Sequence, residues 1–292
     1  MVDVAAKPNG HINKLLDLFK SKFPLHFIWP YIVNASAPIK GKMETFNLMT
    51  AQGQTYSYVI YIPPGYEDGD EEYPVLYHLH GAGVIRNWVE LDCNRLAKQQ
   101  ENAVRQGSTH PHIIVAPIDK TRFSMWVDSV DGQSQAYSKF MDILIPHVES
   151  TYKTIAKREG RALSGFSMGG FGAAITAFKK PDCFNKVVIW DGAIHTWDSL
   201  YENRRKIARS IFGGTAYFNS WSPWKGSFTS TQEPPQFFIV TGELKEPNEN
   251  FVELLKGQGA EVEYISTSCG HDLFCMLQNA GQDFYRFLGK DF

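Results

Sequence analysis

The residues best suited to chemistry lie in the stretch Arg161–Ala174, RALSGFSMGGFGAA, which contains a G-x-S-x-G pattern. This pattern predicts a short apolar strand, a sharp turn at Ser167 and a helix that begins at Met168. The turn needs glycines on both sides, because the strand and the helix nearly collide there. It also places the serine at a helix N-terminus, where free N–H groups favour negative charge. A plain glycine-rich turn is the alternative, but the residues described next favour Ser167 as a nucleophile.

A serine hydroxyl becomes a good nucleophile only when a base removes its proton. For a strand–serine–helix turn the expected order along the chain is serine, acid and histidine, with the histidine after the last strand. His271 stands in that position, in the loop Ser268–Asp272 that follows the predicted strand Glu261–Ser266. It could instead be a solvated surface histidine, but its place in the order makes His271 the predicted general base.

The acid that orients the histidine is less well defined. It should leave the end of the penultimate predicted strand, Gln236–Thr241, where Glu243 is the first choice. Glu246 and Glu249 lie further along the same loop. Asp191, at the end of the preceding strand, is the other serious candidate, since a carboxylate on either strand could hold the imidazole. Each of these side chains could also be an ordinary solvated charge.

An attacked carbonyl develops an oxyanion, which needs two preorganised N–H donors. One predicted donor is the backbone amide of Met168, directly after the serine. The other is the amide of Ala82, with Gly81 as the alternative, in the small-residue loop after the predicted strand Pro74–His80. A plain glycine turn would explain the loop equally simply, but its place one strand–helix–strand step upstream favours the oxyanion role.

Aromatic side chains in the loops around these residues predict a substrate pocket. Core packing is the alternative for each of them. The candidates for substrate binding are Trp88, Trp126, Trp197 and Trp221, with Phe123 and Trp224 beside them.

Composition describes an ordinary globular protein and excludes several classes. The chain has 292 residues, of which 43% are hydrophobic and 21% charged, and its formal net charge is −2. This balance offers nothing to attract nucleic acid or an anionic membrane, and no run approaches a membrane span. The first ten residues lack a basic region leading into an apolar one, so we expect a cytoplasmic protein, or a secreted one whose leader has been removed.

Neither the cysteines nor the histidines predict a metal site. The two metal-like patterns, His78-Leu79-His80 and Cys269-x-His271-x-x-x-Cys275, lack further ligands at the usual spacing. Nucleotide-binding glycine motifs are also missing, so no cofactor is expected. The scattered cysteines predict buried free thiols rather than a disulfide framework. They are Cys93, Cys183, Cys269 and Cys275.

Hydrophobic patterning predicts an α/β fold that can position these side chains. Near-continuous apolar runs are typical of strands buried on both faces, and helical patterns separate them, which indicates a mainly parallel sheet flanked by helices. An antiparallel hairpin, Met43–Thr50 with Thr55–Ile62, precedes this part. The remaining predicted strands are Pro74–His80, His112–Pro117, Lys186–Trp190, Gln236–Thr241 and Glu261–Ser266; the helices are Trp88–Gln106, Ser134–Tyr152, Asn248–Lys256 and Leu273–Leu288.

The predicted organisation is one catalytic domain with two additions. Residues 1–42 form an N-terminal extension with a short helix, His11–Lys22, which could be a brace, a lid or a homodimer contact. Residues 43–292 form the catalytic domain. Within it, residues 191–235 are expected to be an irregular insertion or cap over the carboxyl edge of the sheet.

These motifs resemble the esterase D / feruloyl esterase group of the α/β-hydrolase superfamily, which includes S-formylglutathione hydrolases and mycolyl-transferring enzymes. The resemblance rests on five motifs and covers roughly Met43 to Leu288. It implies an α/β-hydrolase fold and places the catalytic roles on Ser167, His271 and the amides of Ala82 and Met168. The motifs are YHLHGAG (77–83), SMWVDS (124–129), the run from IPHVESTYKT (145–154) to GFSMGGFGA (165–173), NSWSPW (219–224) and CGHDLFCM (269–276).

We therefore expect a serine carboxylic-ester hydrolase that works through an acyl-enzyme. Its substrate would be a small-molecule or carbohydrate-linked ester with an acetyl, feruloyl-like or other small acyl group. An acyltransferase or thioesterase would use the same residues. A non-catalytic binding protein on a hydrolase fold is the alternative from another class.

Overall fold

The computed structural model describes residues 38–49, 53, 55–229 and 233–290, and the predicted helix His11–Lys22 lies outside them. The described strands and helices belong to one compact unit, Lys40–Phe292. Within the described residues, no helix is long and apolar enough to cross a membrane.

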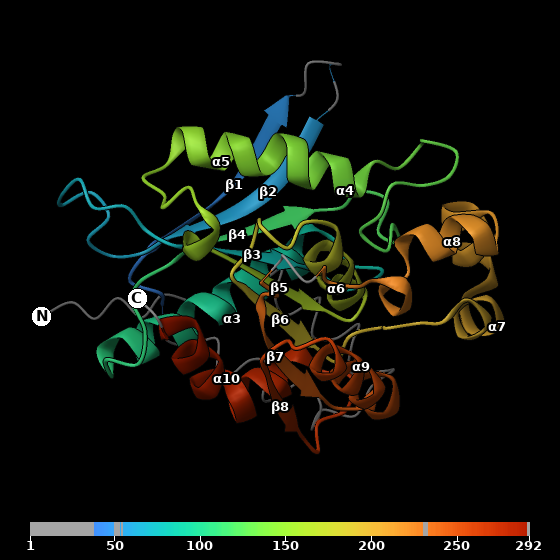
Figure 1. Cartoon of the computed structure of the whole chain (residues 1–292). Helices are drawn as coiled ribbons and strands as arrows, with labels where there is room; N and C mark the ends of the chain where they lie inside the picture. Colours follow the sequence, from blue (N-terminus) through green and yellow to red (C-terminus); the bar gives the residue numbers. More distant parts are fainter. Residues whose placement is uncertain (1–37, 50–52, 54, 230–232, 291–292) are drawn as a thin grey trace, which may run out of the picture. The chain divides into compact units, whose positions relative to one another are not determined.

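An eight-stranded sheet runs through this unit in the order β1-β2-β4-β3-β5-β6-β7-β8 (Figure 1). The first two strands form the predicted antiparallel hairpin, and β2 pairs antiparallel with β4. From β4 through β3 to β8 all neighbouring pairs are parallel, so the carboxyl ends of these six strands lie at one edge of the sheet. The strands are β1 (Lys42–Met49), β2 (Thr55–Ile62), β3 (Val75–Leu79), β4 (Ile113–Ile118), β5 (Arg161–Phe166), β6 (Lys186–Trp190), β7 (Gln236–Thr241) and β8 (Val262–Ser266).

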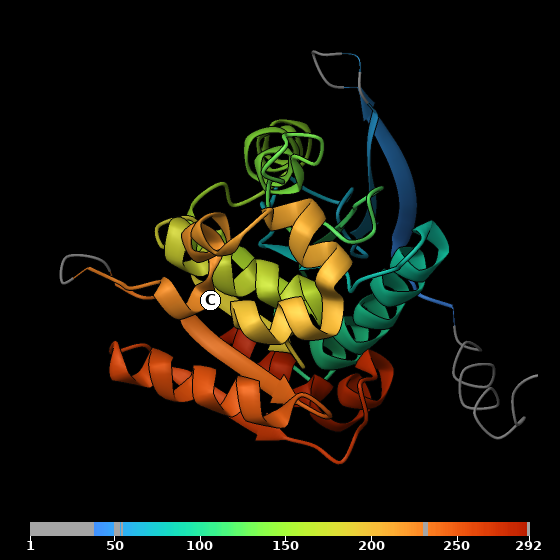
Figure 2. The ribbon, with the colours of Figure 1, turned by 90° about the vertical axis from the view of Figure 1, so that its right-hand side faces the viewer.

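Helices cover both faces of the sheet (Figures 1 and 2). Two long helices, α3 and α10, pack against each other on one face, while α6 lies against β5 and β6 on the other. The α-helices are α3 (Arg86–Arg105), α4 (Ala136–Ser138), α5 (Ile145–Thr151), α6 (Met168–Lys179), α7 (Trp197–Ile207), α8 (Thr215–Trp221), α9 (Lys245–Gly257) and α10 (Leu273–Gly289). The shorter helical segments are η2 (Lys139–Leu144), η3 (Arg158–Gly160), η4 (Ala208–Phe212) and η5 (Pro223–Lys225).

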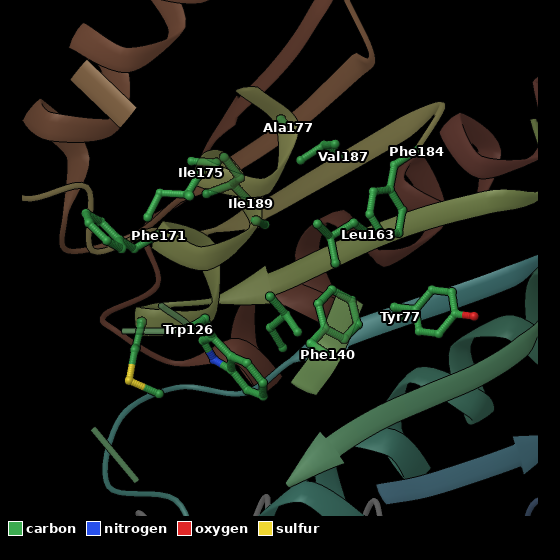
Figure 3. Packing of buried hydrophobic residues seen from close by; sticks show 14 of the residues in the cluster. Tyr77, Trp126, Phe140, Leu163, Phe171, Ile175, Ala177, Phe184, Val187 and Ile189 are labelled. Atoms are coloured by element: carbon green, nitrogen blue, oxygen red, sulfur yellow. The ribbon is translucent and has the colours of Figure 1, made fainter. Parts of the chain in front are cut away.

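The main core lies between the sheet and the α6 face (Figure 3). Tyr77 of β3 meets Phe140 of η2 edge to face, with ring centroids 5.7 Å apart, and contacts Phe184 at 6.1 Å. Edge-to-face arrangements suit the charge distribution of aromatic rings. This packing fixes the position of β3 and β5, whose carboxyl ends carry the residues of interest.

Two predicted helices differ from the structure in instructive ways. The predicted helix Ser134–Tyr152 is a continuous helical run made of α4, η2 and α5, in which the π-helical η2 immediately precedes α5. Pro146 cannot donate a backbone hydrogen bond, and the π turn sits just before it. The helix α9 starts at Lys245, earlier than predicted, because Pro247 is tolerated in a first helical turn.

Residues 191–235 are more regular than predicted. They contain α7, η4, α8 and η5 rather than an irregular loop. Their buried residues Leu200, Phe212 and Phe218 join the main core, so tertiary packing stabilises helices that are short in isolation. The Gly213-Gly214 pair separates η4 from α8 and interrupts the helical pattern in the sequence, so the two short helices could not be identified from it.

Candidate active site

Ser167 occupies the junction between β5 and α6 in a backbone conformation that few residues adopt. Its φ is 55° and its ψ is −114°, outside the favoured regions for a residue with a side chain. Two hydrogen bonds to the end of β6 hold it there: its N–H donates to the Trp190 carbonyl at 3.0 Å, and its carbonyl accepts from Ala193 N–H at 2.9 Å. The surrounding structure therefore fixes the strained turn.

The two glycines of the G-x-S-x-G pattern are required by close backbone contact. A Cβ added to Gly165 would lie 2.0 Å from the Gly169 carbonyl oxygen, and one added to Gly169 would lie 1.9 Å from the Leu79 oxygen. Neither distance is physically possible, so any other residue would force the strand and helix apart. This confirms the predicted reason for the spacing.

The structure brings His271 to Ser167 from 104 residues downstream. The loop after β8 carries it, and its Nε2 lies 2.8 Å from Ser167 Oγ. About a third of the His271 side chain is exposed, and its ring lies against that of Phe166 with centroids 4.7 Å apart. The imidazole therefore meets the serine at the surface, where a substrate can reach both.

The carboxylate that contacts His271 is Asp191, and the prediction of Glu243 is wrong. Asp191 directly follows β6, is fully buried, and places Oδ2 at 2.7 Å from His271 Nδ1. Its backbone is also unusual, with a φ of 43° that turns the chain sharply at the strand end. Asp191 is one of the three alternatives to Glu243 that the sequence leaves open, together with Glu246 and Glu249.

Glu243 takes part through its backbone and not through its carboxylate. The N–H groups of Gly242, Glu243 and Leu244 donate to the Asp191 carboxylate at 2.9, 3.2 and 3.0 Å. These donors replace the water that a buried carboxylate loses. The Glu243 side chain is exposed. The loop after β7 thus wraps around an acid that is supplied by β6, the strand next to Ser167.

The other two carboxylates considered for the acid are also excluded from this position. The Glu246 side chain is exposed. Glu249 accepts a hydrogen bond from Tyr264 at 3.1 Å and lies 3.7 Å from Lys245 Nζ.

The two predicted oxyanion amides belong to segments that adjoin Ser167. Met168 is the first residue of α6, so its N–H has no partner within the helix. Ala82 lies in the loop after β3, and a Cβ placed on the neighbouring Gly81 would be 3.4 Å from Ser167 Cβ. The loop therefore passes directly over the serine.

His80 begins this loop and is held as a neutral imidazole. Its Nδ1 donates to the Gly81 carbonyl at 2.7 Å, and its Nε2 accepts from Asp119 N–H at 3.0 Å. Accepting at Nε2 requires the neutral ring, and burial, which lowers the pKa of His80, also favours the neutral form.

His78, two residues earlier, is also buried, with Nδ1 3.1 Å from Ser164 Oγ. Within the described part of the chain, no group of three or more His, Cys, Asp and Glu side chains could hold a metal ion.

Two of the four predicted substrate tryptophans are placed elsewhere. Trp126 is a core residue, 2% exposed, whose Nε1 donates to the His80 carbonyl at 2.9 Å (Figure 3). Trp221 meets Tyr137 edge to face and lies 4.2 Å from Lys179 Nζ. Lys179 ends α6, about 18 Å from its serine end at 1.5 Å per residue. The position of a tryptophan in a loop does not show whether it lines a substrate pocket or packs in the core.

The other two tryptophans remain half-buried or exposed. Trp197 stacks on Tyr201 and packs against Phe218, so it stabilises the helical segment 191–235. Trp88 is 50% exposed in the first turn of α3, directly after the Ala82 loop. Ile85 at 47% and Phe123 at 43% are exposed nearby, and Phe123 lies 3.7 Å from the Cβ position of Gly83. We call Ile85, Trp88 and Phe123 the apolar rim.

A disulfide encloses the histidine, which corrects the prediction of free thiols for two of the four cysteines. Cys269 and Cys275 are bonded on either side of His271, whereas Cys93 and Cys183 are free. The sequence signal was the pair of cysteines flanking a loop that must hold one side chain still. Asp272 also caps α10 by accepting from the amides of Phe274 and Cys275.

Comparison with known proteins assigns the family. A family model described as "Putative esterase" matches residues 50–234, well over half of the chain. The chain belongs to the esterase family. The match includes Ala82, Ser167 and Asp191, while His271 lies beyond it. The resemblance to the esterase D / feruloyl esterase group that the motifs predicted is confirmed.

Individual relatives agree with this family assignment. The chain is 34% identical over 231 residues to Esterase MT1326 of Mycobacterium tuberculosis, covering 72% of this chain and 48% of that protein. It is 27% identical over 179 residues to an endo-1,4-beta-xylanase/feruloyl esterase of Xylanibacter ruminicola, covering 60% of this chain and 23% of that protein. The chain therefore spans half or less of the length of these curated relatives.

A solved structure of a ferulic acid esterase has the same fold. It superimposes with a TM-score of 0.72 at 21% identity, covering 87% of this chain and all of that one. The expected α/β-hydrolase fold of the chain is confirmed, and at 21% identity the comparison concerns the fold alone.

Proposed function

We propose that this chain hydrolyses carboxylic esters through an acyl-enzyme formed on Ser167. The observation that carries the proposal is the continuous line of hydrogen bonds from Ser167 Oγ through His271 to the buried Asp191, with heavy-atom distances of 2.8 and 2.7 Å. A nucleophile, a base and an orienting acid in this order are the requirements for activating a serine hydroxyl.

The chemistry follows from the geometry. Asp191 accepts from His271 Nδ1–H, which leaves Nε2 free to remove the Ser167 proton as the oxygen attacks the ester carbonyl. The imidazolium that forms is stabilised by the buried carboxylate. It then protonates the leaving alcohol, and in the second half of the reaction the neutral imidazole takes a proton from the attacking water.

The amides of Ala82 and Met168 would stabilise the oxyanion in both steps. Met168 directly follows Ser167, and Ala82 follows Gly81, which packs against Ser167. Within the described residues, neither N–H donates to a backbone acceptor in the helix or the loop, so both are available to an oxyanion. A helix N-terminus adds a favourable electrostatic contribution, because its dipole is positive at the end where Ser167 lies.

We further propose that the substrate carries a small acyl group, acetyl or feruloyl-like. The apolar rim supports this proposal, because Ile85, Trp88 and Phe123 expose apolar area on or directly after the two loops that are joined at Gly83. The name of the Xylanibacter relative includes feruloyl esterase activity, which is consistent with an aromatic acyl group.

The test compares the wild type with Ser167→Ala on p-nitrophenyl acetate. Removing the serine should lower kcat by at least about 1,000-fold, because the remaining groups cannot form an acyl-enzyme. Ser150→Ala is the matched control, since Ser150 is exposed on α5 and remote in the fold, and it should keep wild-type activity. A fluorophosphonate probe should label the wild type on the peptide that contains Ser167. Undiminished turnover by Ser167→Ala would refute the proposal.

A feruloyl ester and an acetyl ester then test the substrate class. Trp88→Ala should raise KM for the feruloyl ester and leave KM for the acetyl ester within about twofold, because only the aromatic group is large enough to use the rim. Equal effects on the two substrates would contradict the role of the rim.

A further inference from the structure

The loop that presents the Ala82 amide is bonded to a single arginine in three places. Gly83 N–H donates to the Arg122 carbonyl at 2.7 Å, and the Arg122 guanidinium donates to the Gly83 carbonyl from Nε at 3.1 Å and from Nη2 at 2.6 Å. Arg122 belongs to the loop after β4. One residue of that loop thus holds both polar backbone groups of Gly83.

The loop that supplies Arg122 is itself well anchored. Arg122 N–H donates to the Asp119 carbonyl at 3.2 Å, and the Asp119 carboxylate accepts from Thr121 N–H at 2.9 Å and from Ser124 N–H at 3.3 Å. Asp119 N–H in turn donates to His80 at the start of the Ala82 loop. The Ala82 loop and the loop after β4 are therefore joined at two places, His80 with Asp119 and Gly83 with Arg122.

Three successive peptide planes around Ala82 are fixed by these bonds. The plane that carries the Ala82 N–H also carries the Gly81 carbonyl, which His80 holds. The next two planes contain the Gly83 N–H and the Gly83 carbonyl, which Arg122 holds. Among the residues that the structure describes, no acceptor takes the Ala82 N–H, so it is left available to a ligand.

Without the Arg122 guanidinium, only the backbone bond from the Gly83 N–H would remain, and the Gly83 carbonyl would lose both of its donors. Gly83 has a φ of +74°, and a glycine can rotate to other conformations at little cost. The bond from His80 holds the Ala82 N–H plane from one side only, so rotation at Gly83 would let the loop shift and displace the Ala82 N–H from the oxyanion. Arg122 also has a positive φ, 66°, which is costly for an arginine and persists because the Gly83 contacts stabilise it.

We propose that Arg122 is a positioning residue that holds the Ala82 amide in the geometry required by the oxyanion. The inference rests on the proposed function, because an oxyanion must form for the position of this amide to matter. Arg122 acts through Gly83 and does not touch the reacting atoms. Its loss should therefore weaken binding of the transition state more than binding of the ester.

The kinetic test compares Arg122→Met, Arg122→Lys and Lys120→Met. Met retains an unbranched apolar side chain but removes the donors, and kcat should fall about 10- to 100-fold with KM within about twofold, because the amide is displaced rather than deleted. In Arg122→Lys the ammonium can still donate one hydrogen bond to Gly83 and should restore part of kcat. Lys120→Met is the matched control, since Lys120 is an exposed cation of the same loop, and it should behave as wild type.

A tetrahedral inhibitor separates positioning from a general structural effect. The inhibition constant of phenylboronic acid, which forms a tetrahedral adduct with an active serine, should rise in Arg122→Met by about the factor by which kcat falls. The melting temperature should stay within about 2 °C, because the side chain is exposed. Unchanged kcat, or a fall in kcat without weaker boronate inhibition, would overturn the proposal.

Hydrogen exchange tests the contact independently of catalysis. Exchange of backbone amides in a peptide covering residues 80–84 should be faster in Arg122→Met than in the wild type, and unchanged in Lys120→Met. If the wild type shows no ester turnover, the proposed function fails while this measurement still reports on the contact. Equal exchange in all three proteins would overturn the positioning role even if the chain is an active esterase.

Discussion

Asp191 shows how a single side chain serves both the site and the fold. Its carboxylate is fully buried, contacts His271 and accepts hydrogen bonds from three backbone amides of the loop after β7. Glu243, one of those three residues, is itself exposed. The two acids therefore differ in the burial and the hydrogen bonding that matter for orienting an imidazole.

A pair of amide substitutions distinguishes them. Asp191→Asn keeps the size but removes the charge that stabilises the imidazolium, so kcat should fall about 1,000- to 10,000-fold, as for acids of serine proteases. Glu243→Gln should stay within about twofold of the wild type, because its backbone N–H is unchanged. Steady-state kinetics on p-nitrophenyl acetate measures both. A larger loss in Glu243→Gln than in Asp191→Asn would contradict the assignment.

At the scale of elements, the loop between β8 and α10 carries the histidine and is tied at several points. Thr267 donates through its hydroxyl and its N–H to the Thr241 carbonyl at 2.8 and 2.9 Å. Gly242 packs closely against the carbonyls of Cys269 and Gly270. The disulfide then joins Cys269 to the first turn of α10. His271 is thus held in a short closed loop.

Opening the disulfide should therefore affect both stability and turnover. In the loop-entropy model, closing a loop of this length stabilises the fold by about 2 kcal/mol. Treatment with a dithiol, or Cys269→Ser with Cys275→Ser, should lower the free energy of unfolding by about that amount and reduce kcat severalfold. Urea unfolding and ester kinetics measure the two effects.

Cys183→Ser provides the control for this experiment. Cys183 is a free, half-buried cysteine outside the loop, so this variant should respond to the dithiol as the wild type does. The disulfide has no role in holding His271 if kcat stays constant after both sulfurs are shown to be reduced.

At the scale of the whole molecule, several histidines are buried as neutral groups. Burial lowers the pKa of His78 to about 3, and of His112 and His195 to about 4. In the unfolded chain each would titrate near its ordinary value of about 6.5. Between these values the unfolded state binds protons that the folded state does not. The stability that these groups contribute is therefore present above pH 6.5 and is lost as the pH falls.

Protonation of these three histidines in the unfolded chain should consequently destabilise the fold as the pH falls, while the buried Asp92, whose pKa burial raises to about 7, acts in the opposite direction. Between about pH 7.5 and about pH 5.5, each of the three histidines should lower the free energy of unfolding by about 1.3 kcal/mol, or up to about 4 kcal/mol together. Urea unfolding at several pH values measures this slope. His112→Phe should remove the contribution of His112, about 1.3 kcal/mol over this interval, and an unchanged slope would contradict the assignment to His112.

The sequence alone determined the features that depend on residues close together in the chain. The spacing of Gly165 and Gly169 predicts the turn at Ser167. Both glycines are required because a side chain would clash with backbone a few residues away or with the adjacent strand β3. The apolar runs predict the order of strands and helices, because burial on both faces leaves a continuous pattern. His271 could be identified because only one histidine follows the last strand at a glycine turn.

Tertiary structure alone decided which distant groups meet. Asp191 and Glu243 both follow buried strands, and only the pairing of β6 beside β5 brings the first of them to His271. Trp126 contacts the Ala82 loop from the core, and Arg122 contacts it from a neighbouring loop. No periodic pattern in the sequence indicates either contact. Such contacts depend on strand order and on the direction of loop backbones, which the summed packing of the whole chain determines.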